Sequence, residues 1–225
     1  MHQMRADNMK KLFPEPPVLK DGRLCLRPLS LSDAECLRLL TREESVYRYL
    51  PTFLFEKQYS QPQDAILRMY GEGLNDSLIL GIFTEERFCG LIEVYSFSAV
   101  FRKVSVGYRL LQEEWGKGIA TEALKIMIGE LELTRGIKVV TASTMPENHA
   151  SAHVLEKNGF TLALHAVKED WGFPEATPTN KWIRFLKKTG KVRWRHLQTG
   201  GPEEAGNIAE SKGAAGGGHP DGAAV

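Results

Sequence analysis

Long apolar runs and a cysteine framework are both missing from this sequence of 225 residues. About 18 consecutive apolar residues are needed to span a membrane, and neither such a run nor the apolar stretch of a secretory signal occurs. The three cysteines, Cys25, Cys36 and Cys89, lie far apart without CxxC or Cys/His spacing, which indicates neither a disulfide framework nor a zinc site. We therefore expect a soluble cytoplasmic protein with reduced thiols and no metal.

An excess of charge is missing as well. Lys and Arg number 29 and Asp and Glu number 28, so the formal net charge is +1, and no global basic field predicts nucleic-acid binding. Basic residues do cluster without an acid around Trp182 and Trp194, at Lys181, Arg184, Lys187, Lys188, Lys191, Arg193 and Arg195. Such a run either docks on RNA or on an acidic protein surface or is a solvated face, and we favour the solvated face.

The hydrophobic content of 42% is enough for one folded domain. We expect a disordered lead-in over residues 1–17, which are polar and contain three prolines, and a folded domain over 18–197. Residues 198–225 are rich in Gly and Ala, lack aromatics and cannot bury enough apolar surface to offset the cost of ordering, so we expect a disordered tail there.

Apolar periodicity predicts a mixed α+β domain. The expected elements, in chain order, are a strand after Arg23, helices over 32–40 and 62–73, strands over 78–83, 88–95 and 104–111, a helix over 119–136, a strand over 137–142, a helix over 150–158, and strands over 160–164 and 182–186. The three central strands form an antiparallel meander. The crossover from 104–111 through a helix to 137–142 predicts a parallel pair beside it.

Residues 115–124, WGKGIATEAL, place two glycines between a strand and a helix. Glycine lets the backbone approach a ligand closely, and the first N–H groups of a helix lack internal partners, so this junction can bind a phosphate. Lys117 and Ile119 do not fit a Walker loop, and Thr121 stands where a dinucleotide fingerprint needs a third glycine. The alternative is that Gly116 and Gly118 only turn a tight loop.

Several motifs together resemble GNAT acetyltransferases of the RimJ/RimL type: residues 22–29, 107–110, the WGKGIATEAL segment, Asn148 with Ser151, and 154–160. The resemblance covers residues 18–187. It implies that 18–197 is an acetyltransferase domain with acetyl-CoA as co-substrate. It also implies a mixed, mostly antiparallel sheet that is flanked by helices and splayed at its centre, between the strands that start near 104 and 137.

The same resemblance implies which residues contact the coenzyme, with backbone amides of the glycine loop on the pyrophosphate. These residues are Tyr108, Arg109, Leu110, Trp115, Gly116, Lys117, Gly118, Ile119, Ala120, Thr121, Asn148 and Ser151. Glu113 stands where many members of the superfamily carry Gln or Arg, which removes one side-chain donor.

Acetyl transfer to an amine needs a base, an oxyanion donor and a proton for the thiolate. Glu93 lies within an apolar strand and is our candidate base, acting through water; the alternative is a glutamate that faces outward. Leu155 stands where many members of the superfamily carry a tyrosine acid, so the resemblance implies Ser151 as the substitute, unless Ser151 only caps a helix. A backbone N–H near Tyr108 would serve the oxyanion.

The pKa of the acceptor amine decides how much help it needs from a base. Deprotonating a lysine side chain at pH 7 costs about 4.6 kcal/mol, whereas an α-amine costs about 1.4 kcal/mol. We therefore expect a peptide or protein α-amine as the acceptor. The alternatives are a small-molecule amine (polyamine, aminoglycoside, amino acid or amino sugar) and a non-catalytic acyl-CoA-binding module. We expect a monomer or a homodimer.

Overall fold

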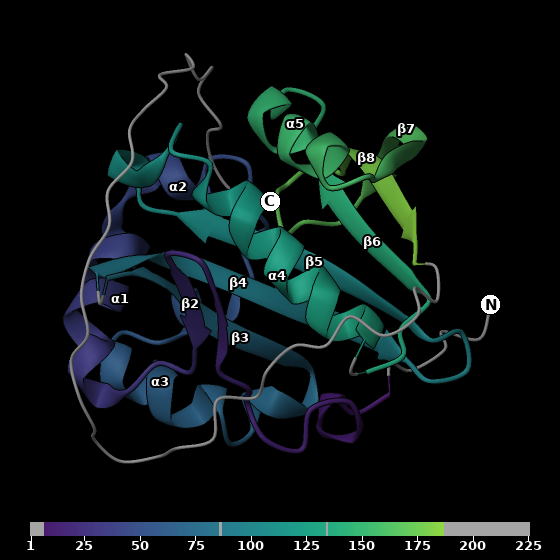
Figure 1. Cartoon of the computed structure of the whole chain (residues 1–225). Coiled ribbons are helices and arrows are strands. Elements are labelled where there is room, and N and C mark those ends of the chain that lie inside the picture. Colours follow the sequence, from purple (N-terminus) through teal and green to yellow (C-terminus); the bar gives the residue numbers. More distant parts are fainter. Residues whose placement is uncertain (1–6, 86, 134, 187–225) are drawn as a thin grey trace, which may run out of the picture.

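The computed structural model describes residues 7–85, 87–133 and 135–186 (Figure 1). Its centre is an eight-stranded sheet in the order β1-β2-β3-β4-β5-β6-β8-β7. The strands are β1 (Leu19–Asp21), β2 (Leu24–Arg27), β3 (Ser77–Thr84), β4 (Arg87–Ser98), β5 (Lys103–Leu110), β6 (Val139–Thr144), β7 (Thr161–Glu169) and β8 (Thr177–Phe185). Only β5 and β6 pair in parallel within this sheet, which confirms the predicted mixed, mostly antiparallel fold.

Helices cover both faces of the sheet. They are α1 (Ala34–Arg42), α2 (Glu44–Tyr47), α3 (Pro62–Met69), α4 (Ile119–Leu133) and α5 (His149–Lys157), with 3-10 turns η1 (Met9–Lys11), η2 (Leu31–Asp33), η3 (Phe55–Gln58), η4 (Gly73–Asn75) and η5 (Gln112–Glu114). On one face, Leu37 of α1 and Ile66 of α3 pack with Leu91 of β4. On the other face α4 lies across the strands, and Leu124 packs with Ile92 (Figure 1). Among the described helices, none combines the length and the apolar character that crossing a bilayer needs.

The sheet opens between its two parallel strands. The ladder between β5 and β6 pairs Lys103 with Val139, Val104 with Val140, and Ser105 with Thr141, and there it ends. Beyond this point β5 stays paired with β4 as far as Leu110, while β6 stays paired with β8 as far as Thr144. The two strands therefore diverge, as Figure 1 shows, and the predicted central splay is confirmed.

The N-terminal segment corrects one prediction. Residues 7–17 were expected to be part of a disordered lead-in, yet η1 lies within them, and Met9 and Phe13 are fully buried in the core that faces α4. The amide N–H of Asp7 also donates to the carbonyl of Phe97 at 2.8 Å. Polar neighbours and prolines conceal these apolar side chains in the sequence. Residues 1–6 and the predicted tail over 198–225 lie outside the described residues.

Several boundaries also differ from those predicted. Strand β1 was not predicted, α3 ends at Met69 instead of Gly73, and β8 begins five residues before the predicted start. Pro178 conceals the start of β8, because proline cannot donate to a ladder. The structure accommodates it where β8 pairs with β7 only, since the ladder with β6 begins at Asn180.

Candidate active site

The glycine loop forms a rigid turn into α4. Gly116 and Gly118 both have φ of +74°, a left-handed conformation that side chains disfavour, which explains why glycine stands at these positions. Arg23 supports the turn, because its guanidinium donates to the carbonyl of Lys117 at 2.6 Å and to both carboxylate oxygens of Glu122 at 2.7 and 3.0 Å. The first amides of α4 follow directly, so the loop and the helix N-terminus together present the kind of backbone N–H groups that can bind an anion.

Two further contacts connect this loop to the sheet. The indole N–H of Trp115 donates to the carbonyl of Leu110, at the end of β5, at 3.0 Å. Lys117 forms an ion pair with the fully buried Glu114 at 3.1 Å, and Arg87 contacts the same carboxylate at 2.9 Å. The end of β5 and residues 115–121 are therefore brought together, as the predicted coenzyme contacts require.

A pair of hydroxyl groups lies on the face of the sheet that α4 and α5 cover. Tyr108 Oη is 2.7 Å from Ser151 Oγ, and both residues are almost fully buried. The helix cap that sequence reasoning considered for Ser151 is made by Asn148, whose side-chain oxygen accepts the amide N–H of Ser151 at 3.2 Å. The Ser151 hydroxyl therefore bonds Tyr108 while Asn148 holds the helix start.

A buried charge cluster lies on the opposite face. Arg109 Nη1 donates to Glu93 Oε2 at 3.1 Å, and Arg109 Nη2 donates to Glu56 Oε2 at 2.6 Å. Glu93 retains 14% side-chain exposure, whereas Arg109 and Glu56 retain 1% and 0%. Glu93 is thus not an outward-facing glutamate, and Arg109, predicted as a coenzyme contact, directs its guanidinium into this cluster.

The cluster shifts the pKa values of its members. Burial raises the pKa of Glu93 and the nearby Glu56 raises it further, against the opposing effects of Arg109 and of a hydrogen bond from Ser77. Burial alone would lower the pKa of Arg109, but the two carboxylates outweigh it and keep the guanidinium charged. A carboxylate with a raised pKa is a better proton acceptor near neutral pH than an exposed glutamate.

Glu56 is the member of the cluster that sequence reasoning missed. It lies in the short turn η3, with no motif or periodicity around it, and its role becomes visible only when the fold brings that turn to β5. The two histidines beside Ser151, His149 and His153, are exposed and are not brought into the site.

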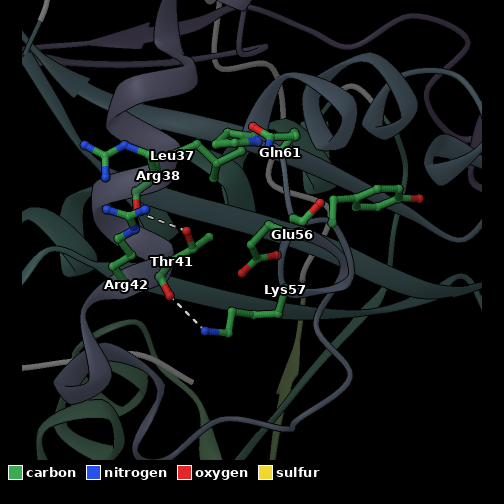
Figure 2. Close-up of a pocket in the computed structure, with 10 residues that line it drawn as sticks. Leu37, Arg38, Thr41, Arg42, Glu56, Lys57 and Gln61 are labelled. Carbon is green, nitrogen blue, oxygen red and sulfur yellow. Dashed lines mark hydrogen bonds between the residues drawn. The ribbon is translucent and has the colours of Figure 1, made fainter.

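A cavity of about 260 Å³ lies beside α1 and the start of α3, and Glu56 is the member of the charge cluster that lines it (Figure 2). Its lining combines residues of α1 with the segment around η3: Leu37, Arg38, Thr41, Arg42, Glu56, Lys57, Tyr59, Ser60, Gln61 and Pro62. Lys57 Nζ donates to the carbonyl of Thr41 at 2.8 Å and closes one side. Three of these residues are cationic, and the one carboxylate, Glu56, is paired with Arg109.

Part of the basic segment lies in β8. Trp182 is buried and donates from Nε1 to Thr144 Oγ1 at 3.0 Å, while Lys181 forms an ion pair with Glu169 and Arg184 donates to the carbonyl of Asn158. These side chains connect β8 to its neighbours β6 and β7 and to the end of α5. Lys187, Lys188, Lys191, Arg193, Trp194 and Arg195 lie outside the described residues.

Comparison with protein families decides the identity. Residues 23–161 match the model of the acetyltransferase (GNAT) domain, which is more than half of the chain. The chain belongs to the GNAT acetyltransferase family. It is 30% identical over 154 residues to the Bacillus subtilis (strain 168) protein named "Probable N-acetyltransferase YjcK", covering 64% of this chain and 83% of that protein.

Solved GNAT structures share the fold. RimL, the ribosomal L7/L12 alpha-N-protein acetyltransferase in complex with coenzyme A, aligns with a TM-score of 0.63 at 17% identity, over 76% of this chain and 98% of RimL. Spermidine N-acetyltransferase from Vibrio cholerae, in complex with CoA and spermine, aligns with a TM-score of 0.62 at 18% identity, over 74% of this chain and 97% of that one.

Acetyl-CoA is the co-substrate of this GNAT enzyme, and the residues present fit it. Gly116 and Gly118 keep Cβ atoms away from the backbone at the start of α4, where a pyrophosphate would meet N–H groups. The ladder between β5 and β6 ends at Ser105 and Thr141, so an extended arm bound between the two strands would lie beside Tyr108. Glu113 is exposed, and an ionised carboxylate accepts hydrogen bonds but cannot donate one to a phosphate.

Proposed function

We propose that this enzyme transfers the acetyl group of acetyl-CoA by direct attack of a primary amine in a ternary complex, and that its acceptor is a peptide or protein α-amine. The observation that carries this proposal is the opposite placement of Glu93 and Ser151. One is a partly exposed carboxylate on the α1/α3 face, and the other is a hydroxyl on the α4/α5 face. Attack of the amine from the first face would expel the thiolate toward the second.

Each proton then has a donor and an acceptor. The amine nitrogen forms a bond to the acetyl carbon as the carbon–sulfur bond breaks, and the amine proton passes to Glu93, directly or through one water. Ser151 protonates the departing sulfur, and Tyr108, 2.7 Å away, can return a proton to Ser151. Release of the Glu93 proton to solvent and uptake of one proton by Tyr108 after the products leave restore the starting state. A backbone N–H of the opened part of β5 would bind the oxyanion.

The cavity beside the charge cluster supports an α-amine over a polyamine. Arg38, Arg42 and Lys57 line it, and the carboxylate of Glu56 is already paired, so a polycation entering here would meet like charges. A peptide brings a single amine of low pKa and side chains that can complement this lining. RimL, a protein alpha-N-acetyltransferase by name, has the same fold, as does the spermidine enzyme.

A pooled acceptor panel tests the proposal. Short peptides with free α-amines, polyamines, aminoglycosides and amino acids are incubated with enzyme and acetyl-CoA, and mass spectrometry detects the gain of one acetyl group. Coenzyme binding is measured in the same sample. Two peptides that differ only in carrying Asp or Lys next to the N-terminal residue form the matched pair, and we expect faster acetylation of the Asp peptide.

The outcomes separate the alternatives. Acetylation of the peptides supports the proposal, whereas acetylation of polyamines or aminoglycosides alone overturns its acceptor class. Coenzyme binding without any transfer favours a non-catalytic acyl-CoA-binding module.

A further inference from the structure

One arginine, Arg109, is paired with two carboxylates in the core of this enzyme. Besides the two hydrogen bonds of its Nη atoms, Arg109 Nε lies 2.6 Å from Glu56 Oε1, so Glu56 contacts the guanidinium through two of its nitrogens and Glu93 contacts it through the third. The three groups together carry a net charge of −1 when both carboxylates are ionised. Glu93 is the member with the largest exposed fraction, 14% of its side chain, whereas Arg109 and Glu56 retain 1% and 0%.

Glu56 is also fixed from its other side. Tyr47 of α2 donates to Glu56 Oε1 at 3.0 Å, and burial together with the Glu56 charge raises the pKa of Tyr47, which keeps it a neutral donor. Four elements, α2, η3, β4 and β5, therefore converge on the guanidinium. Such complete fixation leaves Arg109 one orientation, with Nη1 toward Glu93.

Other groups around Glu93 do not replace Arg109 as its cation. Ser77 of β3 donates a hydrogen bond to Glu93. Tyr95, which lies on β4 as Glu93 does, stays neutral because burial and the nearby Glu93 and Glu169 raise its pKa. Lys181 of β8 is paired with Glu169. Among the described residues, the charges that act on Glu93 at contact range are those of Arg109 and, through it, Glu56.

We propose that Glu56 is a positioning residue for acetyl transfer: it orients Arg109 and takes up part of its charge, so that Glu93 remains an effective proton acceptor. This inference rests on the role of Glu93 as the base in the proposed function. Without Glu56, the whole guanidinium charge would stabilise the Glu93 carboxylate. A carboxylate stabilised in this way binds a proton less readily and is a weaker base.

The direction of the effect follows from the sign of the interaction. The charge of Glu56 raises the pKa of Glu93, so its removal lowers that pKa. The acid limb of the kcat profile, where Glu93 becomes protonated, then moves to lower pH. The plateau of kcat falls because the base is weaker. KM for acetyl-CoA stays unchanged because the described polar contacts of Glu56 are with Arg109 and Tyr47 and not with the glycine loop.

The test compares Glu56→Gln with wild type in kcat and KM as functions of pH, using the best peptide acceptor. Glu72→Gln is the matched control, since it also removes the partner of an arginine, Arg68, but on the surface. We expect a lower plateau and a displaced acid limb for Glu56→Gln only. An acid limb that coincides with that of wild type, at any plateau, would overturn the inference, because a merely structural role lowers the folded fraction and the apparent kcat without moving the limb.

Two further variants keep the result interpretable. Glu56→Asp retains the charge but places it one methylene further from Arg109. We therefore expect a lower kcat, an unchanged KM for acetyl-CoA and an acid limb closer to that of wild type. If Glu56→Gln does not fold, a Glu56→Asp variant with wild-type kcat overturns the inference. Glu93→Gln tests the proposed function by itself. If it retains full turnover, the base assignment fails; if it loses turnover while Glu56→Gln keeps the wild-type profile, only the positioning role fails.

Discussion

The two faces of the opened sheet carry opposite kinds of chemistry. On the α1/α3 face, Glu93 belongs to a cluster of three full charges, whereas on the α4/α5 face the Ser151 hydroxyl is hydrogen-bonded to another hydroxyl, that of Tyr108. A base changes its charge when it accepts a proton, so fixed charges around it shift its pKa. A hydroxyl that passes a proton on stays neutral, and it needs only a well-placed partner.

The largest expected effect comes from removing the ionisable group of the charged face. Glu93→Gln should lower kcat by about 10²- to 10⁴-fold, the usual contribution of a general base. Because burial raises the pKa of Glu93, wild-type kcat should fall with decreasing pH in a range above that of an exposed glutamate, and this limb should be absent in the variant. Steady-state kinetics across pH checks both; an unaltered rate would remove Glu93 from the mechanism.

The two faces should also differ in how much their contacts contribute to the free energy of unfolding. Arg109→Met leaves two buried carboxylates without their cation and should cost about 3–5 kcal/mol in the free energy of unfolding. Tyr108→Phe removes one hydroxyl from a neutral pair and should cost about 0.5–1.5 kcal/mol. Urea unfolding of both variants measures the difference, and equal losses would contradict the contrast between charged and neutral faces.

The neutral face should contribute less to the rate. A thiol with a pKa of about 8.5 gains about 2 kcal/mol by protonation at pH 7, so loss of the proton donor in Ser151→Ala should lower kcat by at most about 30-fold. The acid limb should remain. Ser105→Ala is the matched control, because Ser105 bonds Thr141 in a second hydroxyl pair, 2.9 Å long, at the closed end of the splay. A similar loss in the control would argue against a specific role for Ser151.

The smallest effect should appear in the affinity for acetyl-CoA, because the same bound coenzyme would serve the groups of both faces. Gly118→Ala forces a side chain into a left-handed conformation at about 1 kcal/mol, so KM for acetyl-CoA should rise about 5-fold while kcat changes little. Gly129→Ala in α4 adds a methyl group to open space and serves as the control. If both variants raise KM equally, the conformation of the loop is not what the coenzyme requires.

Sequence reasoning succeeded where the physics is local. The left-handed glycines and the helical spacing of apolar residues in α4 depend on neighbours within a few positions. The break between β5 and β6 is not local, and only the resemblance of the motifs to a family implied it. Sequence reasoning failed for Glu56 and for Phe13, whose partners lie far away in the chain. The direction of the Arg109 side chain likewise depends on which face of β5 its neighbours occupy.

The hydroxyl pair between Ser105 and Thr141 fixes the length of the gap between β5 and β6. It joins β5 to β6 at one end of the gap, while Trp115, bonded to the carbonyl of Leu110, lies at the other end beside the glycine loop. Five residue steps of β5 separate these two contacts, about 17 Å in an extended strand. If the proposed function holds, a donor anchored at the loop extends along this fixed length, and we expect acetyl-CoA to be used in preference to donors with much longer acyl groups.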